Sequence, residues 1–282
     1  MEARDRLGGR AFTRKYQDGV LEMGAQWLHG GCHANNMFNL AASRGLLGPR
    51  VRLLDTWGQG HTFTSSGRVI DEEIAELAME TLDQIEKMEN VDENMSSTFS
   101  FEDYFLQELH GKLNNLDDWS SEKKEDFLMC MRGLQLAVSE YNGDSLQKTS
   151  ALLYSEGTEL PGGDVIVPGG IGGLVDVIAE NLPDIISMNT EVTHIDWSGD
   201  QGFVTVTTNS SSFTCHHVIV TIPLGVLKMN HNQLFTPGLG TEKIKALTSL
   251  NEGSLSKIFL EWSQPWWLPG DKGINFGKLV TV

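Results

Sequence analysis

Two long stretches of regularly spaced apolar residues constrain the first half of this 282-residue chain most strongly. One stretch covers residues 71 to about 91 and the other residues 121 to about 141, and in both the apolar residues recur at intervals of three and four. This spacing places them on one face of a helix. The apolar positions are Ile74, Leu77, Ala78, Leu82, Ile85 and Met88 in the first stretch, and Phe127, Leu128, Met131, Leu134 and Val138 in the second. Residues 71 to about 160 are therefore predicted to form a helical region.

Beyond Leu160 the pattern changes to short β-branched and apolar runs separated by glycine turns. Such runs are typical of strands, and one helix is predicted among them, at residues 172–181. The predicted strands are 165–167, 204–208, 215–221 and 256–262. Strands and helices in this order predict an α/β or α+β fold of two intertwined domains and not a repeat protein.

The helix at 172–181 is entered through a glycine-rich loop, PGGIGG, at residues 168–173. A loop of this kind can cradle a phosphate on the amide groups at the start of a helix. It lacks the GxGxxG spacing and the lysine of a P-loop, so a tight turn with close packing is the favoured interpretation.

The charge of the chain limits its classes of partner. The formal net charge is -17 and the isoelectric point is near 4.8, which would repel a nucleic-acid backbone. A cationic small substrate fits this charge, although an acidic surface commonly serves solubility alone. The three cysteines lie far apart without a metal-binding spacing, so we expect no metal and reduced thiols in an intracellular protein. No apolar run approaches the roughly 20 residues of a membrane helix, so no membrane partner is expected.

The first ten residues carry chemistry suited to a dinucleotide. An acidic residue such as Glu2 can accept hydrogen bonds from the ribose hydroxyls of an adenosine. The glycines Gly8 and Gly9 let a backbone approach a pyrophosphate, whose charge Arg10 would neutralise. The run EARDRLGGR resembles the E-A-x-x-R-x-G-G-R motif of the flavin amine oxidase family. The resemblance implies that Glu2, Gly9 and Arg10 bind FAD.

A second segment, LEMGAQWLHG at residues 21–30, resembles the family segment that runs beside the flavin. Gly24 and Ala25 are small where a flat ring must come close, and the resemblance implies that Gln26 and Trp27 contact the cofactor. The ending W-L-H-G is similar to the W-I-H-G of animal polyamine oxidases.

An isolated histidine such as His29 is most often a surface residue or a satisfied core residue. The surrounding motif favours a functional role for it. The resemblance implies that His29 lines the substrate channel and holds or deprotonates the amine, because an amine must lose its proton before it gives up hydride.

Three further segments extend the resemblance along the chain. EVTHI at 191–195 resembles the strand whose valine backbone contacts the adenine, which implies a cofactor contact for Val192. HVIVTIPLGVLK at 217–228 resembles a family stretch in which a buried strand ends in a proline turn near the cofactor. SKIFLEWSQPWW at 256–267 resembles the family strand that carries a lysine near the flavin.

The last of these segments places Lys257 at the lysine that bonds through a water to flavin N5. By itself, a lysine at the start of an apolar strand is usually an edge or snorkelling residue. Glu140, near the end of the second predicted helix, is a candidate for binding the distal ammonium of the substrate, with a solvated helix-end charge as the favoured alternative.

The resemblance also implies a domain organisation. An FAD-binding dinucleotide fold is expected to be interleaved with a helical and β-sheet substrate domain. The expected parts are a partial FAD-binding domain at 1–70, the helical part of the substrate domain at 71–160, a returning FAD-binding segment at 161–230 and the start of the substrate-domain sheet at 231–282. The family also has a strand and a GxGxxG turn before this region and a G-E-x-T segment after it, so the chain is expected to be truncated at both ends.

The function implied by the resemblance is FAD-dependent oxidation of spermine, spermidine or acetylated forms to an aldehyde, a shorter amine and hydrogen peroxide. The expected partners are a polyamine and oxygen, and the expected state is an intracellular monomer in the cytoplasm or peroxisome. Two alternatives stay open. One is an inactive fragment that binds polyamine or a partner chain, and the other is a histone-demethylase-like amine oxidase.

Overall fold

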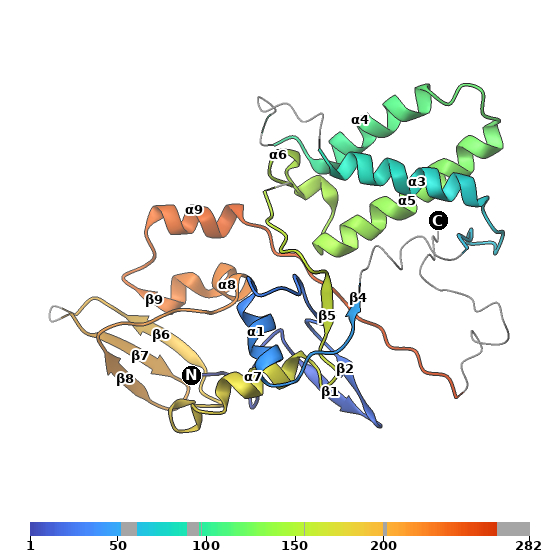
Figure 1. The fold of residues 1–282 in the computed structure, drawn as a ribbon. Helices are drawn as coiled ribbons and strands as arrows, with labels where there is room; N and C mark the ends of the chain where they lie inside the picture. The colour runs from blue at the N-terminus through green and yellow to red at the C-terminus, as the bar shows by residue number, and fades with distance from the viewer. Residues whose placement is uncertain (52–60, 89–95, 97, 155, 200–201, 264–282) are drawn as a thin grey trace. The chain divides into compact units, whose positions relative to one another are not determined.

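The structure is a computed structural model that describes residues 1–51, 61–88, 96, 98–154, 156–199 and 202–263. It divides into two compact units, one formed by Met1–Arg50 with Val165–Glu252 and the other by Val51–Asp164 with Gly253–Val282. Helices and strands are both present, which confirms the predicted α/β class (Figure 1). The boundaries at 50, 165 and 253 differ from the expected ones at 70, 160 and 230, and the assignment of cofactor and substrate roles to each part stays a prediction.

The first unit contains two short strand pairings near its amino terminus. Strands β1 and β2 form an antiparallel hairpin, and β3 pairs antiparallel with β5, which also neighbours β4. The bounds are β1 Thr13–Tyr16, β2 Gly19–Glu22, β3 Trp27–Leu28, β4 Arg50–Val51, β5 Asp164–Ile166, α1 Asn36–Ser43 and α7 Ile171–Ala179. Helices α1 and α7 supply much of the core, which consists of Leu28, Phe38, Ala41, Val165, Val167, Ile171 and Leu174. The predicted strand at 165–167 and the predicted helix at 172–181 are thereby confirmed.

The same unit holds a four-stranded sheet in the order β8-β7-β6-β9, with one helix just before β9 in the chain and one after it (Figure 1). Its bounds are β6 Val192–Asp196, β7 Val204–Thr208, β8 Ser212–Cys215, β9 Phe235–Thr236, α8 Leu224–Leu234 and α9 Thr241–Ser249. A short 3-10 turn, η2, lies at Pro183–Ile185. The strand predicted at 204–208 is confirmed as β7. A small core consists of Ile195 from β6, Leu234 from α8 and Phe235 from β9.

The second unit is a helical bundle. Its elements are α3 Glu72–Glu86, α4 Phe101–Asn114, α5 Ser121–Asn142, the 3-10 turn η1 Leu146–Lys148 and α6 Ala151–Tyr154. Asp71 caps α3, Ser120 caps α5, and Gly143 ends α5 in the left-handed conformation. Both helices predicted from periodicity are confirmed, with α3 ending at Glu86 and residues 89–91 of the first prediction lying outside the described residues. Leu128 is a correction, because its side chain is exposed and does not belong to the buried face.

The predicted strand at 215–221 is wrong beyond Cys215. Strand β8 ends there, and Ile219 is 90% exposed. The part of the chain that the structure describes holds no strand beside these residues, so their backbone groups have no ladder to join. The remainder of the segment 217–228, from Leu224, forms the start of α8.

The predicted strand at 256–262 is also wrong. Residues 251–263 have no regular secondary structure, and Ile258 is 85% exposed. The sheets among the described residues contain no strand from this segment, so its apolar pattern has no neighbouring strand with which to form a ladder.

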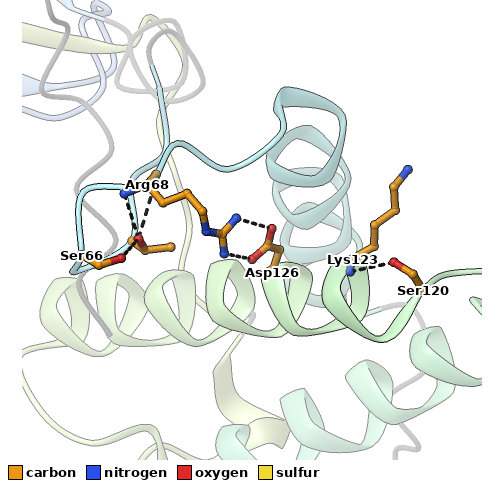
Figure 2. A network of polar contacts seen from close by, with 6 residues as sticks. Ser66, Arg68, Ser120, Lys123 and Asp126 are labelled. Carbon is orange, nitrogen blue, oxygen red and sulfur yellow. Dashed lines mark hydrogen bonds and ion pairs between the residues drawn. The ribbon is translucent and has the colours of Figure 1, made fainter.

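An ion pair ties a loop to α5 within the helical unit. Figure 2 shows the Arg68 guanidinium facing the Asp126 carboxylate, with Nη1–Oδ2 at 2.8 Å and Nη2–Oδ1 at 2.5 Å. The Asp126 side chain is only 7% exposed, whereas that of Arg68 is 47% exposed. The hydrogen bonds from Arg68 lower the pKa of the Asp126 carboxyl below its usual value. The pair therefore stabilises the folded unit when Asp126 is ionised.

We expect Asp126→Asn to lower the free energy of unfolding by about 1 kcal/mol at neutral pH, because Arg68 loses its ionised partner. A carboxyl whose pKa is depressed by folding stabilises above its unfolded pKa of about 3.9 and stops doing so as pH falls through the folded value. The difference from the parent should therefore shrink below about pH 4. Urea unfolding at pH 7 and pH 3 measures it, with the exposed Asp118→Asn as control. Equal stabilities of Asp126→Asn and the parent at pH 7 would contradict the prediction.

Candidate functional site

The glycine turn at residues 8–11 is built by backbone geometry and supported by Arg6. The Ala11 N–H donates to the Gly8 carbonyl at 2.8 Å. A Cβ on Gly8 would lie 2.4 Å from the Ala11 oxygen, so this turn requires glycine there. Gly9, with φ of +52°, has nothing within 4 Å of such a Cβ, and Arg6 Nη1 donates to its carbonyl at 3.0 Å. The backbone at Gly9 is therefore held from one side and open on the other.

The two segments predicted to bind the cofactor lie directly beside each other. The Ala25 N–H donates to the Arg10 carbonyl at 3.1 Å, and the Met23 N–H donates to the Phe12 carbonyl at 2.8 Å. A Cβ on Gly24 would lie 1.7 Å from the Arg10 oxygen, so only glycine allows this approach. The Arg10 side chain is exposed, and no described residue forms an ion pair or hydrogen bond with its guanidinium. The approach thus brings the backbone of Arg10 against the small residues Gly24 and Ala25.

The backbone around His29 is held on both sides. Before it, β3 pairs Trp27 with Ile166 and the following leucine with Val165. After it, the Asn35 side chain donates to the His29 carbonyl at 2.8 Å and also caps α1. The imidazole is exposed and lies 6.4 Å from the Trp27 ring in an edge-to-face arrangement. The imidazole therefore projects from a fixed backbone, and Ala25 and Gln26 just before it are also exposed.

Glu2 and Val192 belong to adjoining segments. The Glu2 N–H donates to the Ser187 carbonyl, and the Thr190 N–H donates to the Glu2 carbonyl, both at 2.8 Å. Val192 begins β6 two residues after Thr190 and is half-buried. The Glu2 carboxylate accepts a hydrogen bond from the Arg4 N–H at 3.0 Å. The two residues predicted to contact the adenosine half of the cofactor are thus linked through their backbones.

The start of α7 is occupied by protein side chains. The Ile171 N–H donates to Glu22 Oε1 at 2.5 Å, and the Gly172 N–H donates to Thr13 Oγ1 at 2.8 Å. These are the amide groups that a phosphate would need. Their use by Glu22 and Thr13 favours the tight-turn interpretation of the PGGIGG loop over a phosphate cradle.

Lys257 and Glu140 lie in the second unit. Glu140 is exposed in the last turn of α5, and Lys257 is half-buried in the irregular segment 251–263. The Ser254 N–H donates to the Gly143 carbonyl at 2.8 Å, which joins this segment to the end of α5. His29 belongs to the first unit, so the two predicted catalytic residues come from different units.

Sequence motifs did not single out Thr13, Glu22 or Asn35, each of which holds a site segment through a side-chain contact. A weak signal existed for Glu22: the loop before α7 offers only glycine at its N-cap, Gly170, so the helix needs an acceptor from elsewhere in the chain. Within the described residues, no group of three or more His, Cys, Asp or Glu side chains is placed to hold a metal ion. No described helix is both long and apolar enough to cross a membrane.

The glycine turn and the segment of small residues beside it are the two segments whose motifs resemble those of the flavin amine oxidases. The sequence matches the flavin containing amine oxidoreductase family over residues 1–282, and the chain belongs to this family. Membership in a flavin-containing family supports FAD as the cofactor.

Its relatives include polyamine oxidases. It is 30% identical over 295 residues to the human peroxisomal N(1)-acetyl-spermine/spermidine oxidase and 29% identical over 293 residues to the bovine protein, with 95% of this chain covered in each case. It is 28% identical over 284 residues to polyamine oxidase 5 of Oryza sativa subsp. japonica, again with 95% of this chain covered. The chain spans 57% of the length of the two mammalian relatives and 54% of the rice protein.

Solved structures of amine oxidases share the fold. A putrescine oxidase bound to putrescine matches with a TM-score of 0.59 and 19% identity, covering 88% of this chain and 56% of that one. Cyclohexylamine oxidase from Brevibacterium oxydans matches with the same TM-score, 17% identity and the same coverage. The fold class is thereby that of the flavin amine oxidases.

Proposed function

We propose that the protein carrying these residues is an FAD-dependent oxidase of polyamines. The observation that carries the proposal is the contact between the segments at Arg10 and Ala25, which leaves Gly9, Arg10, Gln26 and His29 exposed on one unit. The family and the polyamine oxidases among its relatives support the same reaction.

The residues present fit the cofactor. Gly9 offers an open backbone and Arg10 a guanidinium for the pyrophosphate, while Glu2 suits the ribose hydroxyls and Val192 the adenine. The small and flat residues at 24–27 would lie along the ring. When bound, FAD supplies the hydride acceptor for the carbon beside the amine and passes the electrons to oxygen, which gives hydrogen peroxide. The oxidised substrate then hydrolyses to an aldehyde and a shorter amine.

The protein's own side chains would handle protons and orientation. A neutral His29 imidazole can take the proton of the substrate ammonium, because only the neutral amine releases hydride. Lys257 would hold a water near the reacting centre, and the exposed Glu140 would bind a distal ammonium. The net charge of -17 favours the approach of such a cation.

The expected partners are a small polyamine and oxygen. The protein is expected to be a monomer. An intracellular location, in the cytoplasm or the peroxisome, is part of the proposal, and the names of the mammalian relatives support the peroxisome. Localisation of the tagged protein in its source cells tests this part.

Arg10→Ala tests the cofactor assignment. In the protein expressed from the complete reading frame around these residues, we expect FAD affinity to fall roughly tenfold, because the lost contact to a charged phosphate contributes about 1.5 kcal/mol at an exposed site. Arg14→Ala removes an exposed arginine from β1 of the same hairpin region and is the matched control. Titration of FAD into apoprotein measures both. Equal affinities for Arg10→Ala and the parent would remove Arg10 from the site, and a parent that binds no FAD would refute the proposed function.

A further inference from the structure

The amino end of α7 lacks a cap of its own. Its N-cap residue, Gly170, has no side chain, and the first amide groups of a helix have no partner within the helix. Glu22 supplies the acceptor for the Ile171 amide, 149 residues later in the sequence. Thr13 supplies the acceptor for the Gly172 amide, 159 residues later. The helix therefore borrows its cap from the β1–β2 hairpin.

The cap is a closed arrangement of a carboxylate and a hydroxyl. Thr13 and Glu22 are directly opposite each other in the β1–β2 register. The Thr13 hydroxyl donates to Glu22 Oε2 at 2.6 Å, while Glu22 Oε1 accepts from the Ile171 N–H. Both carboxylate oxygens are thus used. A carboxylate is favoured at this end of a helix because the aligned peptide dipoles make it positive.

The glycines of the PGGIGG loop provide the space for this cap. A Cβ on Gly170 would lie 2.2 Å from Thr13 Cγ2, and the residue also has φ of +88°, which favours glycine. A Cβ on Gly172 would lie 3.0 Å from Thr13 Oγ1. Side chains at these positions would push β1 away from the helix.

The cap is continuous with the candidate cofactor site. Thr13 follows Arg10 by three residues, and Glu22 precedes Gly24 by two. Between cap and site, the Met23 N–H donates to the Phe12 carbonyl at 2.8 Å. On the other side of the site, β3 pairs with β5, and α7 begins five residues after the end of that strand. Residues 24–26 therefore lie between Glu22, which contacts α7, and β3, which pairs with the strand that leads into α7.

We propose that Glu22 and Thr13 are positioning residues, which hold Arg10 and residues 24–27 in the arrangement that receives FAD by anchoring them to the amino end of α7. The proposal rests on the proposed function. Neither residue is assigned a contact with cofactor or substrate, so their effect passes through the backbone that they anchor.

The test uses Thr13→Val and Glu22→Leu, which remove the hydroxyl and the carboxylate, and the double variant. Hydrogen–deuterium exchange of a peptide covering residues 168–174 reads the cap without any cofactor, and FAD titration reads the site. We expect each single variant to speed exchange and to raise the FAD dissociation constant by about tenfold. Because the two residues act as one unit, the double variant should be no worse than the worse single variant.

Conservative and control variants separate positioning from general instability. Thr13→Ser keeps the hydroxyl and Glu22→Gln keeps one acceptor. Unlike Thr13→Val and Glu22→Leu, both should therefore retain slow exchange and most of the FAD affinity of the parent. Thr214→Val, an exposed change on β8, should match the parent in both readouts. The flavin absorption spectrum at saturating FAD should shift in Glu22→Leu and return toward that of the parent in Glu22→Gln, which a purely structural loss of stability would not produce.

The outcomes are distinguishable. If the parent binds FAD and Thr13→Val and Glu22→Leu bind it equally well, the positioning proposal is overturned while the proposed function stands. The same holds if Thr13→Ser loses as much affinity as Thr13→Val, since the hydroxyl would then be irrelevant. If the parent binds no FAD, both proposals fail together. If exchange at residues 168–174 is unchanged in Thr13→Val and Glu22→Leu, the cap itself is refuted.

Discussion

Replacing Lys257 by methionine should leave a folded protein that binds FAD but turns over polyamine at least about 10²-fold more slowly, the usual scale for a lost positioned acid–base group. Methionine keeps the length and the apolar stem of the lysine side chain. A lysine that only snorkels would tolerate the change with an effect on stability within about 0.5 kcal/mol and with normal turnover. A lysine that holds a water beside the reacting centre would not.

Stopped-flow measurement of flavin reduction by polyamine and of flavin reoxidation by oxygen shows which half-reaction depends on Lys257. The exposed Lys245→Met on α9 is the matched control and should behave as the parent in both. The half-buried position of Lys257 makes the test informative, because burial alone would also fit a structural role. Parent-like rates in both half-reactions of Lys257→Met would remove the residue from the active site.

The sequence was sufficient for elements whose stabilising contacts are local. Helices α3 and α5 carry both an apolar face and capping residues, such as Asp71 and Ser120, within their own segments. Helix α4 was missed although a signal existed. Ser100 and Asp103 form a capping box, and Phe101, Tyr104 and Phe105 follow at helical spacing. These local features are sufficient to predict a helix there.

Strands are harder to predict because their backbone groups need partners from elsewhere in the chain. The run at 204–208 found neighbours on both sides and formed β7. The runs at 216–221 and 256–262 are equally apolar, yet the described residues provide no strand beside either. Apolar, β-branched composition therefore indicates that a segment can pair, and the pairing itself depends on contacts that periodicity does not encode.

In the candidate site, too, features set by local sequence could be predicted, whereas features set by contacts with distant parts of the chain could not. Its glycines and charged residues could be named from local motifs, because their chemistry is independent of what surrounds them. The cap on α7 could not, since it joins Thr13 and Glu22 to a helix about 150 residues later in the chain. The need for glycine at Gly24 likewise becomes clear only when the Arg10 carbonyl is seen against it.

His29→Ala should lower kcat/KM for polyamine by about 10²- to 10³-fold while leaving FAD content and the flavin spectrum largely intact. The backbone at His29 is held by β3 and by the Asn35 side chain, neither of which uses the imidazole. Removing the ring should therefore leave these backbone contacts in place while it removes the proton-accepting group. The pH profile of turnover should change as well, because an imidazole takes a proton only in its neutral form.

Two comparisons decide whether the histidine acts on the substrate or supports the structure. His110→Ala removes an exposed histidine from α4 and should leave both kcat/KM and its pH profile unchanged. If His29→Ala instead loses FAD and keeps full activity per bound flavin, the ring packs against the cofactor segment and takes no part in handling the amine proton. Loss of FAD with an unchanged pH profile would assign His29 to structure, whereas retained FAD with a changed pH profile would assign it to catalysis.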